Sequence, residues 1–263
     1  MSDLLDLYQK RCPYKIVDVV QSLDFEFDLE QVRREIFKFI VDNNFGFSAV
    51  SLRLPENENN FTSDTEILEA TGVDIHELTT PPYPYNVKDN SEYLKWHPDL
   101  INSYVASLVP RLEEYCGFKI GRIRLGWLQP NSGYPMHVDL EPLRLHIPLF
   151  TNSLAYIIHD EKMYNMKYGK LWHLISTKIH TAYNFGKLPR LHLIFSTYTD
   201  LELESEIKKI ADYDQVKQNF VGQITEQGID KYSLLELFNI TNPNSENKIE
   251  SLRELKRIFD LLP

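Results

Sequence analysis

A chain of 263 residues that is 43% hydrophobic and 12% aromatic has enough apolar side chains for a globular core, which excludes a disordered or fibrous protein. Its formal net charge of −10 disfavours nucleic acid and anionic membranes as partners, because those polyanions attract clustered lysine and arginine. Cys12 and Cys116 are too few for a disulfide framework, and no segment resembles a signal peptide or is apolar enough to span a bilayer, so we expect a cytoplasmic protein.

Two helices are predicted in the N-terminal half of the chain. Residues 31–42 place apolar side chains on one face at helical spacing, and Asn43 and Asn44 end the run. Residues 100–115 repeat this pattern and are followed by Gly117, a typical stop signal. Both helices are expected to pack an apolar face against the core.

The segment between these helices is predicted to be a strand followed by loops. Residues 47–54 are typical of a strand, whereas residues 55–64 are rich in Asn and Glu. Residues 79–90 contain three prolines interleaved with two tyrosines. A loop of this length is either a mobile lid over a site or a solvated connector whose aromatic side chains pack on the core.

From residue 118 the pattern changes to short apolar or alternating segments. Turn signals such as Asn131-Ser132-Gly133 and Phe185-Gly186 separate these segments. Such spacing indicates a β-sandwich or a small barrel. The predicted strands are 119–128, 143–150, 154–159, 170–175, 178–185 and 190–199.

After Asp200 the strand signals end and charge-rich helical patterns follow to the C-terminus. We therefore predict one domain over residues 1–199, with its β core at about 118–199, and a helical region over residues 200–263. The oligomeric state is not predicted by any feature of the sequence.

Six of the eight histidines lie between His137 and His192, within the predicted β region. His137 and Asp139 are two residues apart, so in an extended segment both side chains leave the same face, and His180 supplies a third group from a later strand. Two imidazoles and one carboxylate leave three coordination positions open, which suits Fe(II) that binds an organic co-substrate and dioxygen, whereas zinc more often takes histidines or cysteines. The alternative is a hydrogen-bonded histidine beside a turn aspartate.

Arginines accompany this predicted metal triad. Arg144 and His146 are two residues apart on one strand, and Arg190 begins the strand after His180. A buried guanidinium needs an anion, and its fork matches a carboxylate, so a dicarboxylate such as 2-oxoglutarate is the predicted ligand. The alternative role for each arginine is a surface salt bridge, and the alternative for His146 is a histidine that caps the core.

Together these residues resemble the aspartyl/asparaginyl β-hydroxylase family of Fe(II)- and 2-oxoglutarate-dependent oxygenases. The resemblance implies a mainly β double-stranded β-helix, the jelly roll shared with cupins, with iron near one open end. It also implies that Arg190 pairs with the distal carboxylate of 2-oxoglutarate, while Arg144 and His146 hold the co-substrate near the iron. The matching motifs, over about a quarter of the chain, are His137-Val138-Asp139, Arg144-Leu145-His146, Gly169-Lys170, His180-Thr181-Ala182-Tyr183-Asn184 and Arg190.

Two positions distinguish this chain from other members of that family. Animal members that hydroxylate protein side chains have glycine where this chain has Asp139, so the chain is more similar to bacterial hydroxylases of free amino acids such as proline. Gly126 stands where some members have a serine that touches the co-substrate. Arg124, on the same strand, is either a ligand for a substrate carboxylate or a strand-edge arginine.

The resemblance implies a dioxygenase that hydroxylates an unactivated C–H bond and releases succinate and CO2. A free amino acid or a small derivative is the first predicted substrate, and an Asp, Asn or Pro side chain in a protein or peptide is the second. A cupin-like binding protein without activity is a rival, but a passive metal site needs no anion anchor such as Arg190. Reading residues 200–263 as an interaction module would require a vestigial iron site.

Other polar residues of the β region remain open between site and structure. Asn184 and His192 suit either role, and Trp172 is interpreted mainly as a core residue. Partners are not apparent for His76, His97 and His159.

Overall fold

The computed structural model describes residues 2–45, 50–61, 90–130, 132–133, 139, 141–159, 162–178, 180–200 and 205–206. Its strands are β1 (Val20–Leu23), β2 (Val50–Ser51), β3 (Arg53–Leu54), β4 (Lys95–Trp96), β5 (Lys119–Leu128), β6 (Ser132–Gly133), β7 (Arg144–Phe150), β8 (Ala155–His159), β9 (Lys162–Tyr164), β10 (Leu171–Leu174), β11 (His180–Asn184) and β12 (Arg190–Tyr198). Its helices are α1 (Ser2–Gln9), α2 (Leu29–Asp42) and α5 (Tyr104–Cys116), with 3-10 turns η1 (Asn90–Glu92) and η2 (Pro98–Leu100).

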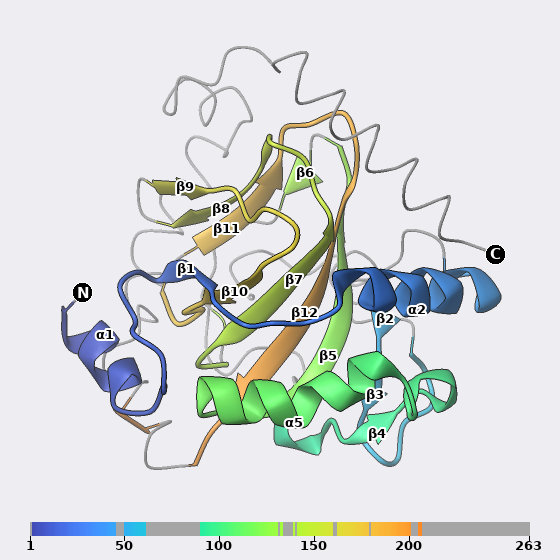
Figure 1. Ribbon diagram of the computed structural model, residues 1–263, viewed down its shortest axis with the longest axis horizontal. Coiled ribbons are helices and arrows are strands. Elements are labelled where there is room, and N and C mark those ends of the chain that lie inside the picture. Colours follow the sequence, from blue (N-terminus) through green and yellow to red (C-terminus); the bar gives the residue numbers. More distant parts are fainter. Residues whose placement is uncertain are drawn as a thin grey trace, which may run out of the picture.

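Antiparallel pairing organises these strands into two main sheets (Figure 1). The larger, six-stranded sheet has the order β1-β10-β7-β12-β5-β2, and the smaller, four-stranded sheet has the order β6-β11-β8-β9. Strands β3 and β4 form a separate pair. The predicted double-stranded β-helix is confirmed, and all six strands predicted between residues 118 and 199 are present with their ends shifted by at most two residues.

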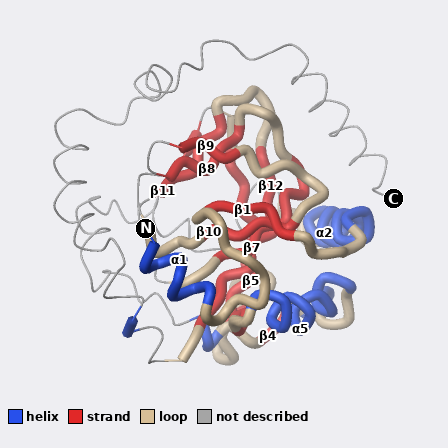
Figure 2. Tube along the Cα trace, turned by 60° about the vertical axis from the view of Figure 1, so that its left-hand side comes forward, coloured by secondary structure: helices blue, strands red, loops and turns tan. Residues whose placement is uncertain are grey.

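Helices α2 and α5 lie beside each other on one side of the larger sheet (Figure 2). Glu35 of α2 accepts the backbone N–H groups of Tyr104 at 2.9 Å and Val105 at 3.0 Å, which satisfies donors at the start of α5. The fully buried Arg33 donates from Nε to the Leu149 carbonyl oxygen at 2.9 Å. These bonds fix both helices against each other and against β7. Both helices were predicted, and α5 ends at Gly117, whose φ of 76° is the left-handed conformation that glycine adopts without strain.

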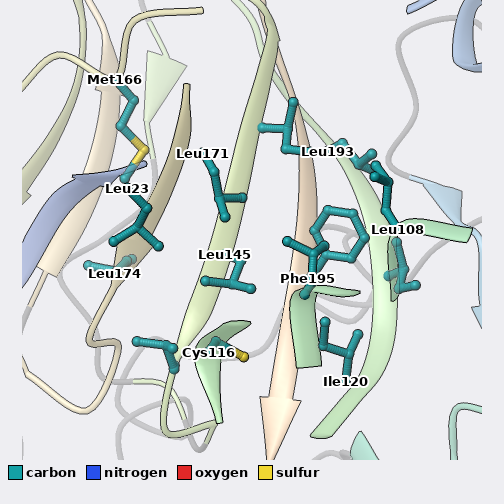
Figure 3. Packing of buried hydrophobic residues seen from close by; sticks show 14 of the residues in the cluster. Leu23, Leu108, Cys116, Ile120, Leu145, Met166, Leu171, Leu174, Leu193 and Phe195 are labelled. Carbon is teal, nitrogen blue, oxygen red and sulfur yellow. The ribbon is translucent and has the colours of Figure 1, made fainter. Parts of the chain in front are cut away.

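The sheet face toward these helices is apolar. Leu145, Leu193 and Phe195 are fully buried and belong to one core cluster with Leu108 of α5 (Figure 3). At about 25 cal/mol per Å² of apolar surface, burying each such side chain contributes roughly 2 kcal/mol. This packing accounts for the alternating pattern of β7 and β12, because the opposite face carries the polar side chains of the candidate site.

Several short elements were not predicted, among them α1 and β1, and one predicted strand is interrupted. The N-terminal α1 is a short helix that buries Leu4, Leu7 and Tyr8, which follow helical spacing. Strand β1 has only four residues and pairs at the edge of the larger sheet. The strand predicted over 47–54 is interrupted between β2 and β3, and part of it lies outside the described residues.

Other predictions fall outside the described ranges. The proposed lid at 79–90 is described only at residue 90, and the predicted helical region 200–263 only at residues 200, 205 and 206. Among the helices of the described ranges, none has the length and apolarity to cross a membrane. Cys12 and Cys116 are buried free thiols, so no disulfide joins the two cysteines.

Candidate active site

Strand register gathers the polar side chains on the face of the larger sheet that is opposite the helices. On β7 and β12, His146 is paired with Ile194. Because alternate residues of a strand share a face, Arg190 and His192 lie on the same face as Arg144 and His146. Arg144 and His146 were predicted to share a face, and the register adds Arg190 and His192 from a strand more than 40 positions later.

Asp139 and His180 form the pair of groups that a metal ion would join. His180 Nδ1 lies 2.8 Å from the Lys178 carbonyl oxygen and must donate to it, since a carbonyl only accepts. In the neutral ring Nε2 therefore carries a lone pair, and it lies 3.1 Å from Asp139 Oδ2. Two acceptors at this distance require a cation or a proton between them. Imidazole and carboxylate are both ligands of Fe(II), so this donor set fits the predicted metal.

The third predicted ligand, His137, lies outside the described residues, as does its neighbour Val138. Within the part of the chain that the structure describes, no three His, Cys, Asp or Glu side chains converge on one point. The described geometry therefore supplies two of the three predicted ligands, and the role of His137 stays a prediction.

Arg144 is held by two carboxylates of the chain itself. Its guanidinium lies 2.5 Å from Asp139 Oδ2 and 2.6 Å from Glu141 Oε1, and its Nε also donates to Glu141 at 2.7 Å. Ser196 of β12 donates to the same Glu141 oxygen at 2.9 Å. The anion that a buried Arg144 requires is thus provided at least partly by the protein, which the sequence interpretation did not foresee.

Glu141 is the site residue that the sequence analysis missed. Burial alone would raise the pKa of its carboxyl group, yet the Arg144 guanidinium outweighs this effect and holds the pKa below its ordinary value. Glu141 is therefore an anion. Two signals pointed to it: it continues the alternation from His137 through Asp139, and it stands three residues before Arg144.

The segment carrying Asp139 and Glu141 is fixed by residues from distant parts of the chain. Asp139 N–H donates to the Ser176 carbonyl oxygen at 2.9 Å, and Ser176 Oγ donates to the Glu141 carbonyl oxygen at 2.6 Å. The Tyr8 hydroxyl of α1 donates to the Pro142 carbonyl oxygen at 2.5 Å. The unpredicted α1 helix therefore positions the loop that carries Asp139, one of the predicted metal ligands.

His146 and His192 form a buried pair beside these charges. Their Nδ1 atoms are 3.4 Å apart, their rings are nearly perpendicular, and the side chains are 3% and 1% exposed. Burial, followed by the charge of Arg190, lowers the pKa of each ring well below its ordinary value, so both rings are neutral. Both Nε2 atoms are buried and lack a hydrogen-bond partner among the described residues.

The remaining arginines surround this histidine pair. Arg190 is 3% exposed at the start of β12, and its charge acts on the pKa of both rings. Arg124 is partly buried on β5 opposite Ile194, which puts it on the same sheet face, and its charge also acts on His146. Burial, and then the nearby Arg124 charge, lowers the pKa of Arg122 to about 9. This concentration of positive charge favours an anionic ligand.

Gly126 and Asn184 have clear structural reasons for their identity. A Cβ atom at Gly126 would lie 2.6 Å from Ile194 Cδ1, so Ile194 fills the space that a serine would need. Asn184 is fully buried, donates to the Leu188 carbonyl oxygen at 2.7 Å and accepts from Asn152 Nδ2 at 3.1 Å. Asn184 therefore stabilises a turn. Of the two roles that the sequence left open for it, the contacts favour the structural one.

Three further residues that the sequence analysis considered also have structural roles. His173 is buried, accepts from the Tyr14 hydroxyl at 2.8 Å and donates to the Asp18 carbonyl oxygen at 2.9 Å. Trp172 packs against the core, as predicted. His97 caps η2 through its ring nitrogen.

Comparison with known proteins supports the resemblance proposed from the motifs. Residues 99–199 match the family Aspartyl/Asparaginyl beta-hydroxylase, which confirms that resemblance. The chain is 33% identical over 81 residues to L-proline cis-4-hydroxylase of Rhizobium meliloti (strain 1021), a stretch covering 31% of this chain and 29% of that enzyme. The chain thus spans less than a third of the length of that relative.

Solved structures show weaker similarity. A prolyl-4-hydroxylase of Pseudomonas putida aligns over 75% of this chain and 94% of its own, with 9% identity and a TM-score of 0.39. A 2OG-Fe(II) oxygenase family oxidoreductase of Burkholderia pseudomallei aligns over 38% of this chain and 53% of its own, with 15% identity and a TM-score of 0.30.

Proposed function

We propose that the chain, a relative of the aspartyl/asparaginyl β-hydroxylases over its β core, is an Fe(II)- and 2-oxoglutarate-dependent dioxygenase. The observation that carries this proposal is the 3.1 Å separation of His180 Nε2 and Asp139 Oδ2, beside a buried group of arginines and histidines. His137, Asp139 and His180 would hold the metal. When bound, iron and 2-oxoglutarate supply the activation of dioxygen that hydroxylates a substrate C–H bond, with succinate and CO2 as co-products.

The protein's contribution to this reaction begins with orienting the two described ligands. The Lys178 carbonyl oxygen accepts from His180 Nδ1 and so fixes the tautomer in which Nε2 would bind a metal ion. The Arg144 guanidinium, itself held by Glu141, fixes the position of the Asp139 carboxylate. Such supporting contacts reduce the reorganisation that metal binding requires.

The co-substrate is proposed to bind along the polar face of β7 and β12. Arg190 is buried at the start of β12, where a carboxylate would offset the cost of desolvating its charge. We assign it the distal carboxylate of 2-oxoglutarate, and we assign Arg144 and His146 the end that lies near the metal. Burial of these groups also keeps water away from the reacting centre.

A free amino acid such as proline, or a small derivative, is the proposed substrate, and similarity to L-proline cis-4-hydroxylase supports it. Arg124 would pair with the substrate carboxylate from β5, the strand next to β12. The second candidate is an Asp, Asn or Pro side chain in a peptide, for which the net charge of −10 favours a neutral or basic target. A screen of succinate release ranks the two classes, because turnover with peptides alone would reverse this order.

An anaerobic titration with Fe(II) and 2-oxoglutarate tests metal and co-substrate together. The wild-type protein should develop the visible metal-to-ligand charge-transfer band, and Arg190→Ala should need a much higher 2-oxoglutarate concentration. Arg111→Ala, which removes an exposed arginine of α5, is the matched control and should behave as wild type. A wild-type protein that binds Fe(II) but never forms the band would support the cupin-like binding protein instead.

A further inference from the structure

The His146–His192 contact restricts where the protons of both rings lie. A neutral imidazole has one N–H and one lone pair, so a hydrogen bond between the two Nδ1 atoms has a single proton. One ring then donates from Nδ1 and has a bare Nε2. The other accepts at Nδ1 and carries its proton on Nε2. The two histidines therefore have opposite tautomers.

The order of the two rings relative to Asp139 and His180 follows from the strand register and agrees with the charges that act on them. Burial and then Arg190 lower the pKa of both rings. Arg144, Arg124 and His180 also act on His146, whereas the further charge that acts on His192 is that of His146. The register agrees, because His192 is paired with Pro148, two residues further from Arg144 than His146 is. His146 therefore lies on the metal side, and His192 lies behind it.

We propose that His192 is a positioning residue for the co-substrate: its Nδ1–H donates to His146 Nδ1, so that His146 presents Nε2–H to a carboxylate of 2-oxoglutarate. This inference rests on the proposed function. A carboxylate only accepts hydrogen bonds, so the opposite tautomer would turn a lone pair toward it. The positive charges of Arg144 and Arg190 draw an anion to this point.

The assignment also suits the burial of the pair. His146 Nε2 is buried and has no hydrogen-bond partner among the described residues, and a carboxylate of 2-oxoglutarate would supply one.

Nitrogen-15 NMR of the histidine rings reads the tautomers directly. In the wild-type protein with Zn(II), a diamagnetic substitute for iron, and 2-oxoglutarate, we expect His146 protonated at Nε2 and His192 protonated at Nδ1. Observation of His146 protonated at Nδ1 would overturn the inference, whatever the activity of the enzyme.

Three substitutions separate positioning from packing. His192→Asn can place an amide N–H where Nδ1–H stood and should keep near wild-type affinity for 2-oxoglutarate. His192→Gln reaches the Nε2 position instead, and His192→Leu has no donor, so both should bind 2-oxoglutarate about tenfold more weakly, the effect of losing one hydrogen bond. Calorimetry on anaerobic Mn(II)-loaded protein measures this affinity, and thermal unfolding checks that each variant folds.

The outcomes distinguish this inference from the proposed function. If wild type and His192→Leu bind 2-oxoglutarate equally, or if His192→Asn is as weak as His192→Leu, the positioning role is wrong while the oxygenase assignment stands. If His192→Leu does not fold, His192→Gln decides. If the wild-type protein does not bind 2-oxoglutarate, the proposed function and the carboxylate contact both fail.

Discussion

Replacing Glu141 with glutamine tests whether a carboxylate next to the predicted ligands Asp139 and His180 stabilises the site. Glu141 is 11% exposed at its side chain and accepts two N–H groups of Arg144 and the hydroxyl of Ser196 through one oxygen. The amide keeps the shape and an acceptor oxygen but removes the charge that balances a buried guanidinium. Removing one partner of a buried ion pair costs about 3–5 kcal/mol, and because an acceptor remains we expect about 3 kcal/mol.

The same substitution should weaken metal binding. With Glu141 neutral, the Arg144 guanidinium pairs more strongly with Asp139, 2.5 Å away, and competes with a metal for that carboxylate. Loss of such supporting contacts typically lowers metal affinity about 10- to 100-fold. Urea denaturation of the metal-free protein measures the stability, and competition with a chromophoric chelator measures Fe(II) affinity.

A surface substitution of the same chemistry provides the control. Glu114→Gln removes an exposed carboxylate of α5 and should change neither stability nor metal affinity measurably. If Glu141→Gln matches Glu114→Gln in both measurements, the argument that Glu141 holds Arg144 and Asp139 in place is refuted.

Three further predictions concern the support of the site. Tyr8→Phe removes the hydroxyl that donates to Pro142 and should lower the free energy of unfolding by about 1 kcal/mol in urea denaturation, and no change would mean that α1 does not hold this loop through that bond. Burial lowers the pKa of His173 to about 4 from 6.5, so its contribution to stability is complete above pH 6.5 and is lost as the pH falls toward 4, at most about 3 kcal/mol. His173→Gln should therefore show a shallower loss of stability between pH 6.5 and 4 in denaturation at several pH values, and an unchanged slope would contradict this. Gly126→Ser brings a Cβ to 2.6 Å from Cδ1 at the flexible end of Ile194, which must shift, so the protein should be destabilised by about 1 kcal/mol. Adding Ile194→Val should recover part of that loss if the contact is the cause.

Local patterns in the sequence determined most secondary structure. Strands β5 and β12 alternate apolar and polar residues because one sheet face packs against helices and the other carries the site. Gly117 ends α5 because only a residue that tolerates positive φ fits there. These signals are local, so they are readable without the fold. Helix α1 was missed because eight residues give too short a periodic pattern.

The sequence also identified the residues that are proposed to carry the chemistry. Asp139, His180, Arg144 and Arg190 were selected from their identity and spacing. The structure brings Asp139, His180 and Arg144 into contact and puts Arg190 on the same sheet face as Arg144. Their roles toward iron and 2-oxoglutarate remain proposals.

Only the tertiary structure decided how these groups are paired. Glu141 binds Ser196 from a strand 55 positions away, and His146 faces His192 across β7 and β12. Such pairs depend on strand order and register, which long-range packing of the two sheets sets and which no local periodicity encodes. For the same physical reason the sequence suggested an external anion for Arg144, whereas the folded chain brings its own carboxylates to that guanidinium.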